Sequence, residues 1–544
     1  MTERTGGEAV VAALRALGVR HVFGIVSVHN IPIFDAILRD GSIEHVAVRH
    51  EQAAVHAADG YARATGRLGV AIASTGPGTT NAMTGLFEAA AASSPVLLIT
   101  GQVDTAWYGK GKGFLHEAES QLPMLRTVCR RVDSVRRTEQ IARTLLEVAR
   151  DVLDGRPQPG AVEIPIDLQY RRAPVEIPAF EPSPPLRPDR EALDRALELL
   201  RRTRRRVIWA GGGSLDAAAA IRQLADVLRA PVFTTINGRG VIPETHALAM
   251  GPLTAHPALQ PVFEGADLLV AIGTRFQGGA TRNWTLPLPM PIVHIDADPG
   301  VIGRNYPAAV AVVADARTAL EALLERLDAP ANDEAFTAAA VGARDAARSQ
   351  IREDIGPDHA AIMDTMRELL PREAVIVRDA TIPAYLWGNR LFPILEPRTS
   401  IYPASAAIGP GLPLAIGAAV ATGRPTAVIQ GDGGLMLSIG ELATLAQYRL
   451  PVILCVFNDR GYGVLRSIQA RTFEGRTTGV DLATPDFAAV ARAMGIRGER
   501  VEGAAAFREA FARAVAEGGP ALIEIDADAL APMRGFPQPP RRQP

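Results

Sequence analysis

The stretch from Gly431 to Gly463 reads GDGGLMLSIGELATLAQYRLPVILCVFNDRGYG, and it decides the fold. The apolar run PTAVIQ before it predicts one strand, and PVILCVFND predicts a second strand that ends at Asn458 and Asp459. A helix between two such strands favours a parallel pair. Asp432 and Asp459, 27 positions apart, then share the carboxyl edge of the sheet, where open α/β sheets bind ligands.

The residue types at this edge indicate an anion that is held through a cation. Carboxylates cannot bind a phosphate directly, but a hard divalent cation such as Mg²⁺ can bridge Asp432 and Asp459 to a diphosphate. The helix that begins in Gly431-Asp432-Gly433-Gly434 would turn its positive N-terminus toward the same anion.

Composition excludes several classes of protein. With 544 residues the chain is long enough for about three domains. Its 57 basic and 59 acidic residues leave a net charge of −2, so no basic field indicates a nucleic-acid partner. Two cysteines are too few for a disulfide framework or a cysteine-based metal centre. The first residues lack the pattern of a signal peptide, and we therefore expect a cytoplasmic protein.

One uncharged segment, Ile401 to Gly423, is long enough to span a bilayer. Pro403, Pro410 and Pro413 interrupt any helix through its first half. We therefore predict a buried loop that leads into a buried helix, and no membrane association.

Apolar runs alternate with helical patterns along most of the chain, which predicts an α/β fold with three domains, each a mostly parallel sheet flanked by helices. The Pro-rich stretch Ala179 to Pro188 reads as one linker, and the polar, Ala-rich stretch Ala329 to Asp354 reads as a second boundary. The expected domains cover residues 1–175, 189–330 and 355–530. The Pro/Arg-rich tail, residues 531–544, is expected to be loosely held.

Three further motifs complete the pattern. They are VRHEQAAVHAADGYARATG from Val48, STGPGTTNAMTGL from Ser74 and SAAIGPGLPLAIGAA from Ser405. With the GDG…ND motif they resemble the thiamine diphosphate-dependent enzyme superfamily, in its acetolactate synthase, benzoylformate decarboxylase and benzaldehyde lyase branch. The resemblance covers essentially the whole chain and implies pyrimidine-binding, central and diphosphate-binding domains in that order.

The resemblance also assigns roles to residues. Asp432 and Asp459 match the side-chain metal ligands, and Gly461 matches the backbone-carbonyl ligand, although the family usually has asparagine in place of Asp459. Glu51 matches the acid that protonates the pyrimidine ring, whereas taken alone it reads as a solvated glutamate in the first turn of a helix. The positions that match cofactor contacts are Gly433, Gly434, Thr381, Ala406, Ile408, Asn81 and Tyr462. Among these, Ile408 matches the apolar residue that bends the cofactor, and the carbonyl of Ala406 matches the acceptor of its exocyclic amine.

Two histidines depart from the synthase pattern. His29 lies in the turn GIVSVHN, where synthases have a glycine-rich turn, and benzaldehyde lyase-like enzymes carry a histidine there that faces the reacting carbonyl. His116 stands where glutamine is usual. We assign both a catalytic role, with a pocket-lining role as the alternative.

The resemblance implies a thiamine diphosphate- and Mg²⁺-dependent lyase or carboligase that cleaves or forms a C–C bond next to a carbonyl of a small 2-oxo acid, aldehyde or hydroxy ketone. It also implies a homodimer as the minimal active unit, because Glu51 and the metal site come from different subunits, and relatives pair such dimers into homotetramers. FAD is possible in the central domain but not favoured, because Gln277 and Gly278 replace acidic residues. The alternatives are a 2-hydroxyacyl-CoA lyase or oxalyl-CoA decarboxylase, against which the short tail argues, and a non-catalytic relative that binds the cofactor.

Overall fold

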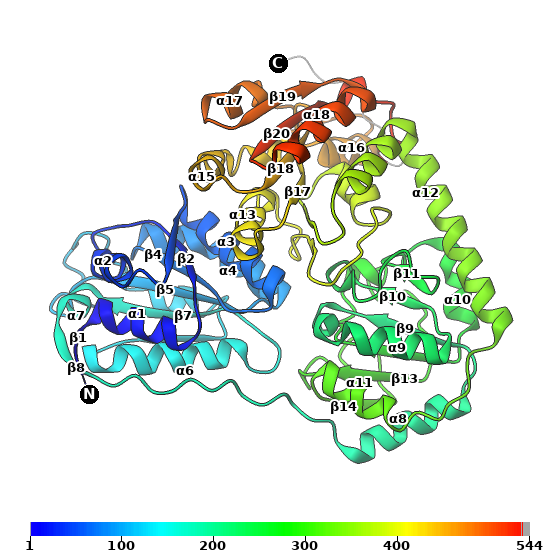
Figure 1. Cartoon of the computed structure of the whole chain (residues 1–544), viewed down its shortest axis with the longest axis horizontal. Coiled ribbons are helices and arrows are strands. Elements are labelled where there is room, and N and C mark those ends of the chain that lie inside the picture. Colours follow the sequence, from blue (N-terminus) through cyan, green and yellow to red (C-terminus); the bar gives the residue numbers. More distant parts are fainter. Residues whose placement is uncertain (1, 535, 537–544) are drawn as a thin grey trace.

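A computed structural model describes residues 2–534 and 536; residue 1 and the tail positions 535 and 537–544 lie outside the described part. Three six-stranded sheets follow one another along the chain, and all their strands are parallel. Helices flank each sheet (Figure 1). The predicted fold class is therefore confirmed.

The strands of each sheet come from one continuous part of the chain. The first sheet holds β2 (His21–Gly24), β3 (Glu44–Ala47), β4 (Gly69–Ala73), β5 (Val96–Gln102), β6 (Arg131–Ser134) and β7 (Gly160–Pro165). The central sheet holds β9 (Arg206–Ala210), β10 (Val232–Thr234), β11 (Ala249–Gly251), β12 (Leu268–Ile272), β13 (Ile292–Asp296) and β14 (Val310–Val313). The third sheet holds β15 (Val375–Arg378), β16 (Ser400–Ile401), β17 (Thr426–Gly431), β18 (Val452–Asn458), β19 (Arg497–Val501) and β20 (Ala521–Asp526).

The helices lie between these strands in sequence. Those of the first domain are α1 (Gly6–Ala16), α2 (Ile31–Asp40), α3 (Glu51–Thr65), α4 (Pro77–Ala92), α5 (Gln121–Leu125), α6 (Ile141–Leu153) and α7 (Ile166–Tyr170). Those of the central domain are α8 (Arg190–Arg202), α9 (Ala218–Leu228), α10 (Gln260–Gly265) and α11 (Ala316–Leu324). The third domain has α13 (Gly411–Thr422), α14 (Asp432–Leu435), α15 (Leu442–Tyr448), α16 (Gly463–Thr472), α17 (Phe487–Ala493) and α18 (Gly503–Glu517), and α12 (Glu334–Leu369) precedes them.

Strand order shows where each sheet can bind a ligand. The first sheet runs β3-β2-β4-β5-β7-β6 and the third runs β16-β15-β17-β18-β20-β19, which is one topology used twice. The central sheet runs β11-β10-β9-β12-β13-β14, the order of dinucleotide-binding folds. The direction of winding reverses between β2 and β4, between β15 and β17, and between β9 and β12. Crevices at the carboxyl edge form at these reversals.

Helices α3 and α13 join the first and third domains at very close range. A Cβ atom added at Gly60 would lie 2.0 Å from the carbonyl oxygen of Leu414, and one at Gly417 would lie 1.8 Å from that of Ala57. These two glycines therefore permit a helix contact that any side chain would push apart. The buried helix predicted in the uncharged segment is confirmed as α13. The loop before it is only partly buried, and among the described residues no helix is long and apolar enough to cross a membrane.

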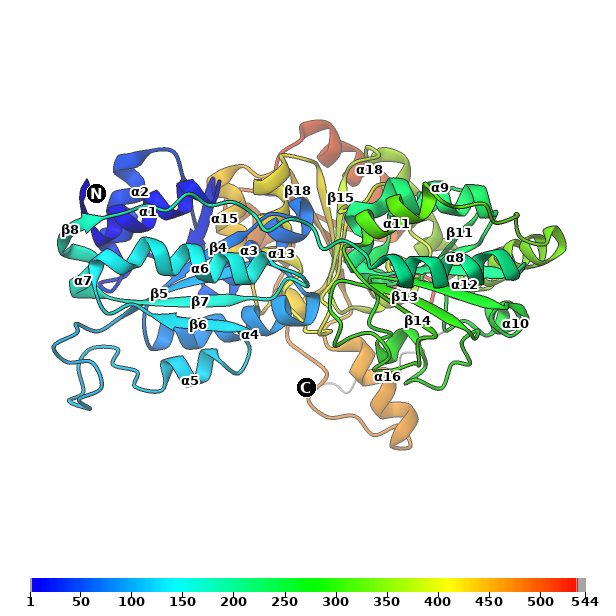
Figure 2. The ribbon, with the colours of Figure 1, turned by 90° about the horizontal axis from the view of Figure 1, so that it is seen from below.

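The Ala-rich stretch expected as a domain boundary is mostly helical, because it forms the first part of α12. Alanine favours helix strongly, and the buried side chains recur every three or four residues along it, at Ala340, Arg344, Ala347, Ile351 and Ile355. Gly356, with φ 78°, interrupts the helical path before Pro357. The resulting kinked rod runs from the central to the third domain, whereas an extended segment joins the first domain to α8 (Figures 1 and 2).

Candidate active site

The carboxylate of Asp432 stands at the reversal point of the third sheet, directly after β17. Its side chain is almost fully buried, and its Oδ2 accepts a hydrogen bond of 2.8 Å from the N–H of Gly461. Its Oδ1 is also buried but has no hydrogen-bond partner in the described part of the chain. Burial raises the pKa of Asp432. A buried hydrogen-bond acceptor without a donor lowers the stability of a protein, and a bound cation would offset that loss of free energy.

Asp459 follows β18, the strand next to β17, so the structure brings both predicted carboxylates to one edge. The extra charge at this position has a counter-ion: Nη1 of the buried Arg466 lies 3.6 Å from the Asp459 Oδ2 atom. The same guanidinium donates from Nε to Asp481 at 2.8 Å. Arg466, which sequence analysis did not single out, thus offsets the charge difference between aspartate and the usual asparagine.

The backbone beside these carboxylates is closely packed at Gly433, Gly461 and Tyr462. A Cβ atom at Gly433 would lie 2.7 Å from the Tyr462 ring and 3.3 Å from the carbonyl oxygen of Gly461. A Cβ atom at Gly461 would lie 2.0 Å from the carbonyl oxygen of Val480. Side chains are therefore excluded from the space in which a phosphate would approach the backbone. The described residues contain no group of three or more histidine, cysteine, aspartate or glutamate side chains that could hold a metal. Two carboxylates and a backbone carbonyl would leave the remaining positions of a cation to ligand oxygens.

The helix expected after the GDG motif is shorter than predicted. α14 ends at Leu435, and a 3₁₀ turn precedes α15. Leu437, just after α14, lies close to the loop before α13. A Cβ atom built at Gly409 of that loop would lie 2.9 Å from the Cβ atom of Leu437. A four-residue helix has a small dipole, so the expected stabilisation of an anion by the helix terminus is corrected to a minor one.

Asp379 lies on the other side of the reversal, directly after β15, and sequence analysis missed it. It is buried and accepts hydrogen bonds from the N–H groups of Gly409 and Gly411 and from Nε2 of Gln430. Burial raises its pKa to about 6. Two residues further on, Thr381 Oγ1 would lie 2.9 Å from a Cβ atom at Gly431. Its place directly after a predicted strand was the signal that could have revealed Asp379.

The first sheet presents a second set of polar side chains at its own reversal point. His29 follows β2 and is 2% exposed, and Ser74 follows the neighbouring strand β4. Ser74 Oγ lies 3.5 Å from Nδ1 of His29 and 3.4 Å from Nδ1 of His116, and the two rings are 5.1 Å apart. Burial, and then the neighbouring His116, lower the pKa of His29, so its imidazole is neutral near pH 7. The structure thus places the two predicted histidines together and adds Ser74, which sequence analysis quoted but did not select.

Glu51 is the first residue of α3, and its Oε2 accepts a hydrogen bond of 3.0 Å from Nδ2 of Asn81 on α4. A Cβ atom at Gly78 would lie 3.2 Å from its other oxygen. Glu51 and Asn81, predicted on separate motifs, are therefore in direct contact.

Ala406 and Ile408 lie in the loop that joins β16 to α13. Ala406 adopts a left-handed backbone with φ 61°, which is unusual for a residue with a side chain. Ile408 is 39% exposed, a large fraction for an isoleucine next to a buried helix. Its apolar side chain is available to a ligand or to another surface.

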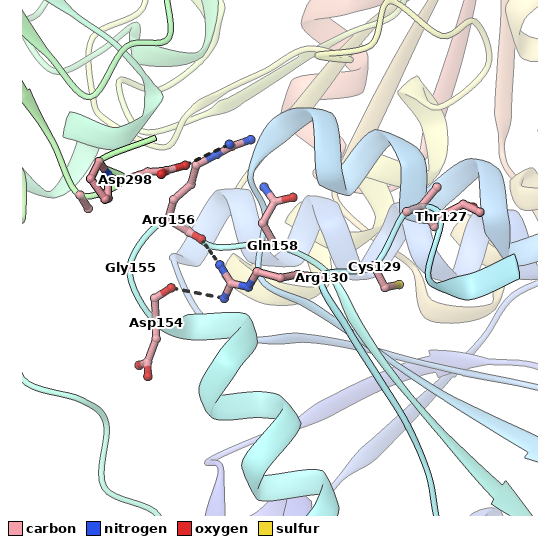
Figure 3. A pocket seen from close by; sticks show the side chains of 11 residues that line it. Thr127, Cys129, Arg130, Asp154, Gly155, Arg156, Gln158 and Asp298 are labelled. Carbon is pink, nitrogen blue, oxygen red and sulfur yellow. Dashed lines mark hydrogen bonds and ion pairs between the residues drawn. The ribbon is translucent and has the colours of Figure 1, made fainter. Parts of the chain in front are cut away.

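A cavity of about 500 Å³ lies elsewhere, between the first and central domains (Figure 3). Its residues precede β6 and β7 and follow β13, so it opens at the amino ends of the first sheet, away from His29 and Ser74. Arg156 reaches across it to Asp298 at 3.4 Å and donates to Ser93 at 2.8 Å. The cavity is therefore separate from both sets of predicted site residues.

Matches to family models identify the protein family to which this chain belongs. The chain matches three models of thiamine pyrophosphate enzymes: the N-terminal TPP binding domain over residues 4–124, the central domain over 193–323 and the C-terminal TPP binding domain over 384–525. The protein belongs to the thiamine pyrophosphate-dependent enzymes, as its motifs predicted.

Individual proteins similar to this chain include acetolactate synthases and a decarboxylase. The chain is 32% identical to a probable acetolactate synthase large subunit of Methanocaldococcus jannaschii, over 96% of this chain and 92% of the relative. It is 37% identical to a probable 2-ketoarginine decarboxylase of Pseudomonas aeruginosa, over 90% of this chain and 88% of the relative. It is 31% identical to the acetolactate synthase isozyme 3 large subunit of Escherichia coli, over 90% and 88%.

Proposed function

We propose that this enzyme uses thiamine diphosphate and Mg²⁺ to decarboxylate a small 2-oxo acid, or to join its acyl group to a second carbonyl compound. The observation that carries the proposal is the buried oxygen Oδ1 of Asp432, which has no hydrogen-bond partner among the described residues and lies beside Asp459 and the Gly461 carbonyl. This donor set is suited to a hard cation that binds a diphosphate. When bound, thiamine diphosphate supplies the nucleophilic carbon and the electron sink that such chemistry requires.

The residues of the chain would then have distinct tasks. Asp432, Asp459 and the carbonyl of Gly461 hold the cation, and the N–H groups near Gly433 and Gly434 face the diphosphate. Glu51, oriented by Asn81, holds the proton that the pyrimidine ring must exchange. His29 and His116 offer ring nitrogens to the oxygen of the reacting carbonyl, and Ser74 fixes the two rings relative to one another.

A second copy of the chain would complete each site. Val28 and Leu115 at the first edge and Leu437 at the third edge are all more than half exposed, beside side chains assigned to the site. Apolar groups around a catalytic edge favour a surface that another chain covers. We therefore propose a homodimer as the minimal active unit, with pairing into a homotetramer.

Flavin is not part of the proposal. At the reversal of the central sheet the N–H groups of Gly211 and Gly213 bond to the carbonyl oxygens of Ile272 and Gly273. A Cβ atom at Gly211 would lie 2.1 Å from the Gly273 oxygen, so these glycines serve to pack two loops together. The N–H groups of Gly211 and Gly213 are therefore not available to the phosphates of a dinucleotide.

The proposal is tested by a substrate panel. The purified protein, supplied with thiamine diphosphate and Mg²⁺, is incubated with aliphatic, aromatic and basic 2-oxo acids, with hydroxy ketones and with 2-hydroxyacyl-CoA. We expect cofactor-dependent CO₂ release from at least one 2-oxo acid. Turnover of the acyl-CoA alone would contradict the proposal and favour the CoA-dependent alternative.

The variant Glu51→Gln supplies a second criterion. It keeps the hydrogen bond from Asn81 but has no acidic proton, so we expect turnover to fall by about 10²-fold or more with cofactor binding retained. Glu44→Gln, an exposed position on β3 of the same domain, is the matched control and should keep full activity. Equal activities of the two variants would refute the role of Glu51.

A further inference from the structure

The segment Tyr402–Pro410, called here the Ile408 loop, has no helix or strand of its own. It carries Ala406 and Ile408, which the family resemblance matches to the acceptor of the cofactor's exocyclic amine and to the apolar residue that bends the cofactor. An irregular segment such as this loses conformational entropy when it adopts one shape. The contacts that hold this loop therefore decide how well its two functional residues are placed.

The end of the loop near α13 is held within its own domain. Asp379 Oδ2 accepts from the N–H of Gly409 at 3.0 Å and from that of Gly411 at 3.1 Å. This anchor comes from β15 of the third sheet. It fixes the loop after Ile408 but not before it.

The other end is held by the first domain. Glu88, a fully buried residue of α4, accepts hydrogen bonds from the N–H of Ala404 at 2.6 Å and from that of Ser405 at 3.0 Å. The hydroxyl of Ser405 donates to the same carboxylate. Arg63 of α3 donates from Nη1 to the carbonyl oxygen of Tyr402 at 2.7 Å.

These two anchors belong to one buried cluster of charges. Arg63 Nη2 lies 2.5 Å from Glu88, and the same guanidinium forms a two-point contact with Asp59 at 2.9 and 2.7 Å. Burial alone raises the pKa of Glu88, but Arg63 and Ser405 outweigh it, so that pKa lies below its ordinary value and the carboxylate is charged. Replacing a buried ion cluster by apolar side chains of similar volume is often neutral or stabilising, so the cluster is weak evidence of a role in stability; its hydrogen bonds to residues 402, 404 and 405 instead suggest a role in placing the loop.

We propose that Arg63 and Glu88 are positioning residues for the cofactor: they hold residues 402–405 so that the Ala406 carbonyl and the Ile408 side chain face it. The inference rests on the proposed function. It makes the first domain of each chain responsible for the shape of a loop in its third domain. Neither residue needs to touch the cofactor.

Two variants test the proposal by changing different hydrogen bonds between Glu88 and the loop. Glu88→Gln keeps the size of the side chain but removes its charge, and Ser405→Ala removes only the hydroxyl and leaves the ion cluster intact. Glu198→Gln, an exposed residue of α8, is the control. Correct folding is verified for each by circular dichroism and by its melting temperature.

The first readout does not involve turnover. In protein dialysed free of cofactor, amide hydrogen exchange of the peptide covering residues 402–411 should be at least about 10-fold faster in Glu88→Gln than in wild type, because hydrogen bonds to a charged acceptor are strong. The second readout is the Kd for thiamine diphosphate with Mg²⁺, from quenching of tryptophan fluorescence. We expect about 10-fold weaker binding in Glu88→Gln and about 3-fold weaker binding in Ser405→Ala, with the control unchanged.

Unchanged exchange and unchanged Kd in the folded variants would overturn the proposal. If Glu88→Gln does not fold, Ser405→Ala decides the matter by the same two measurements. A wild-type protein that binds no thiamine diphosphate would instead contradict the proposed function, and the exchange experiment would still report whether Glu88 holds the loop.

Discussion

Replacing His29 by alanine is the most informative single change in the proposed active site. The side chain is 2% exposed, its Nδ1 is 3.5 Å from Ser74 Oγ, and its ring stands 5.1 Å from that of His116. Removing one positioned donor to a developing oxyanion typically lowers the rate by a factor of about 10²–10³, or roughly 3–4 kcal/mol. We expect a loss of this size in kcat.

The assay follows kcat and KM on the best substrate from the panel, together with the Kd for thiamine diphosphate. The expected result is a lower kcat with an unchanged Kd, because His29 lies at the first edge and the predicted diphosphate contacts lie at the third. His246→Ala is the control, since His246 is a partly exposed residue of the central domain, paired with Asp226 and remote from both sheet edges that carry the proposed site.

The pH profile provides an independent criterion. Burial and His116 lower the pKa of His29, so the ring stays neutral at and above its ordinary pKa and gains a proton only at more acidic pH. If catalysis requires the neutral ring of His29, the kcat of the wild-type enzyme should fall as the pH is lowered and the ring gains a proton. The His29→Ala variant should lack this decrease in kcat. A change confined to KM, or to which substrates are accepted, would refute a catalytic role and leave His29 as a wall of the pocket.

Three further outcomes are expected. Dialysis against EDTA should abolish binding of thiamine diphosphate as measured by fluorescence, and Mg²⁺ should restore it; binding without any metal would contradict the roles of Asp432 and Asp459. The purified protein should show no absorbance in the visible flavin bands, and a stoichiometric flavin spectrum would disprove our reading of the Gly211–Gly213 loop. Burial lowers the pKa of His56 and of His359 to about 4, so the unfolded chain takes up protons first as pH falls below about 6.5. Stability should therefore decline between about pH 6.5 and 4, by roughly 3 kcal/mol per histidine, and His56→Leu should have a melting temperature that declines less with acid than that of wild type.

The sequence by itself determined the class of fold and the two edges. Apolar runs such as PTAVIQ and PVILCVFND are long and bounded by glycine, proline or aspartate, so local patterning identifies them as buried strands. Residues directly after such strands, including Asp432, Asp459 and Ser74, must lie at a carboxyl edge whatever the sheet order is. This is why motif spacing predicted that Asp432 and Asp459 lie at the same edge of the sheet, on adjacent strands.

Other local features were less certain from sequence. The Ala-rich stretch before Gly356 looked like a boundary, because it has few large apolar residues, yet small side chains pack its helix closely against two domains. One helix was expected after the GDG motif, but α14 and α15 are separated by a 3₁₀ turn, and Leu437 between them lies close to the loop at Gly409. Both outcomes depend on neighbours far away in the chain.

Only the tertiary structure decided which edge residues meet. Strands β2 and β4 are adjacent at a reversal of the sheet, and this brings together His29, Ser74 and His116. Local hydrophobic periodicity does not specify the order of strands in a sheet. Glu88 and Ser405 are 317 positions apart and meet only because α4 packs beside the loop before α13. Contacts of this kind depend on how sheets and helices pack, and hydrophobic patterning specifies which faces are buried without specifying against what.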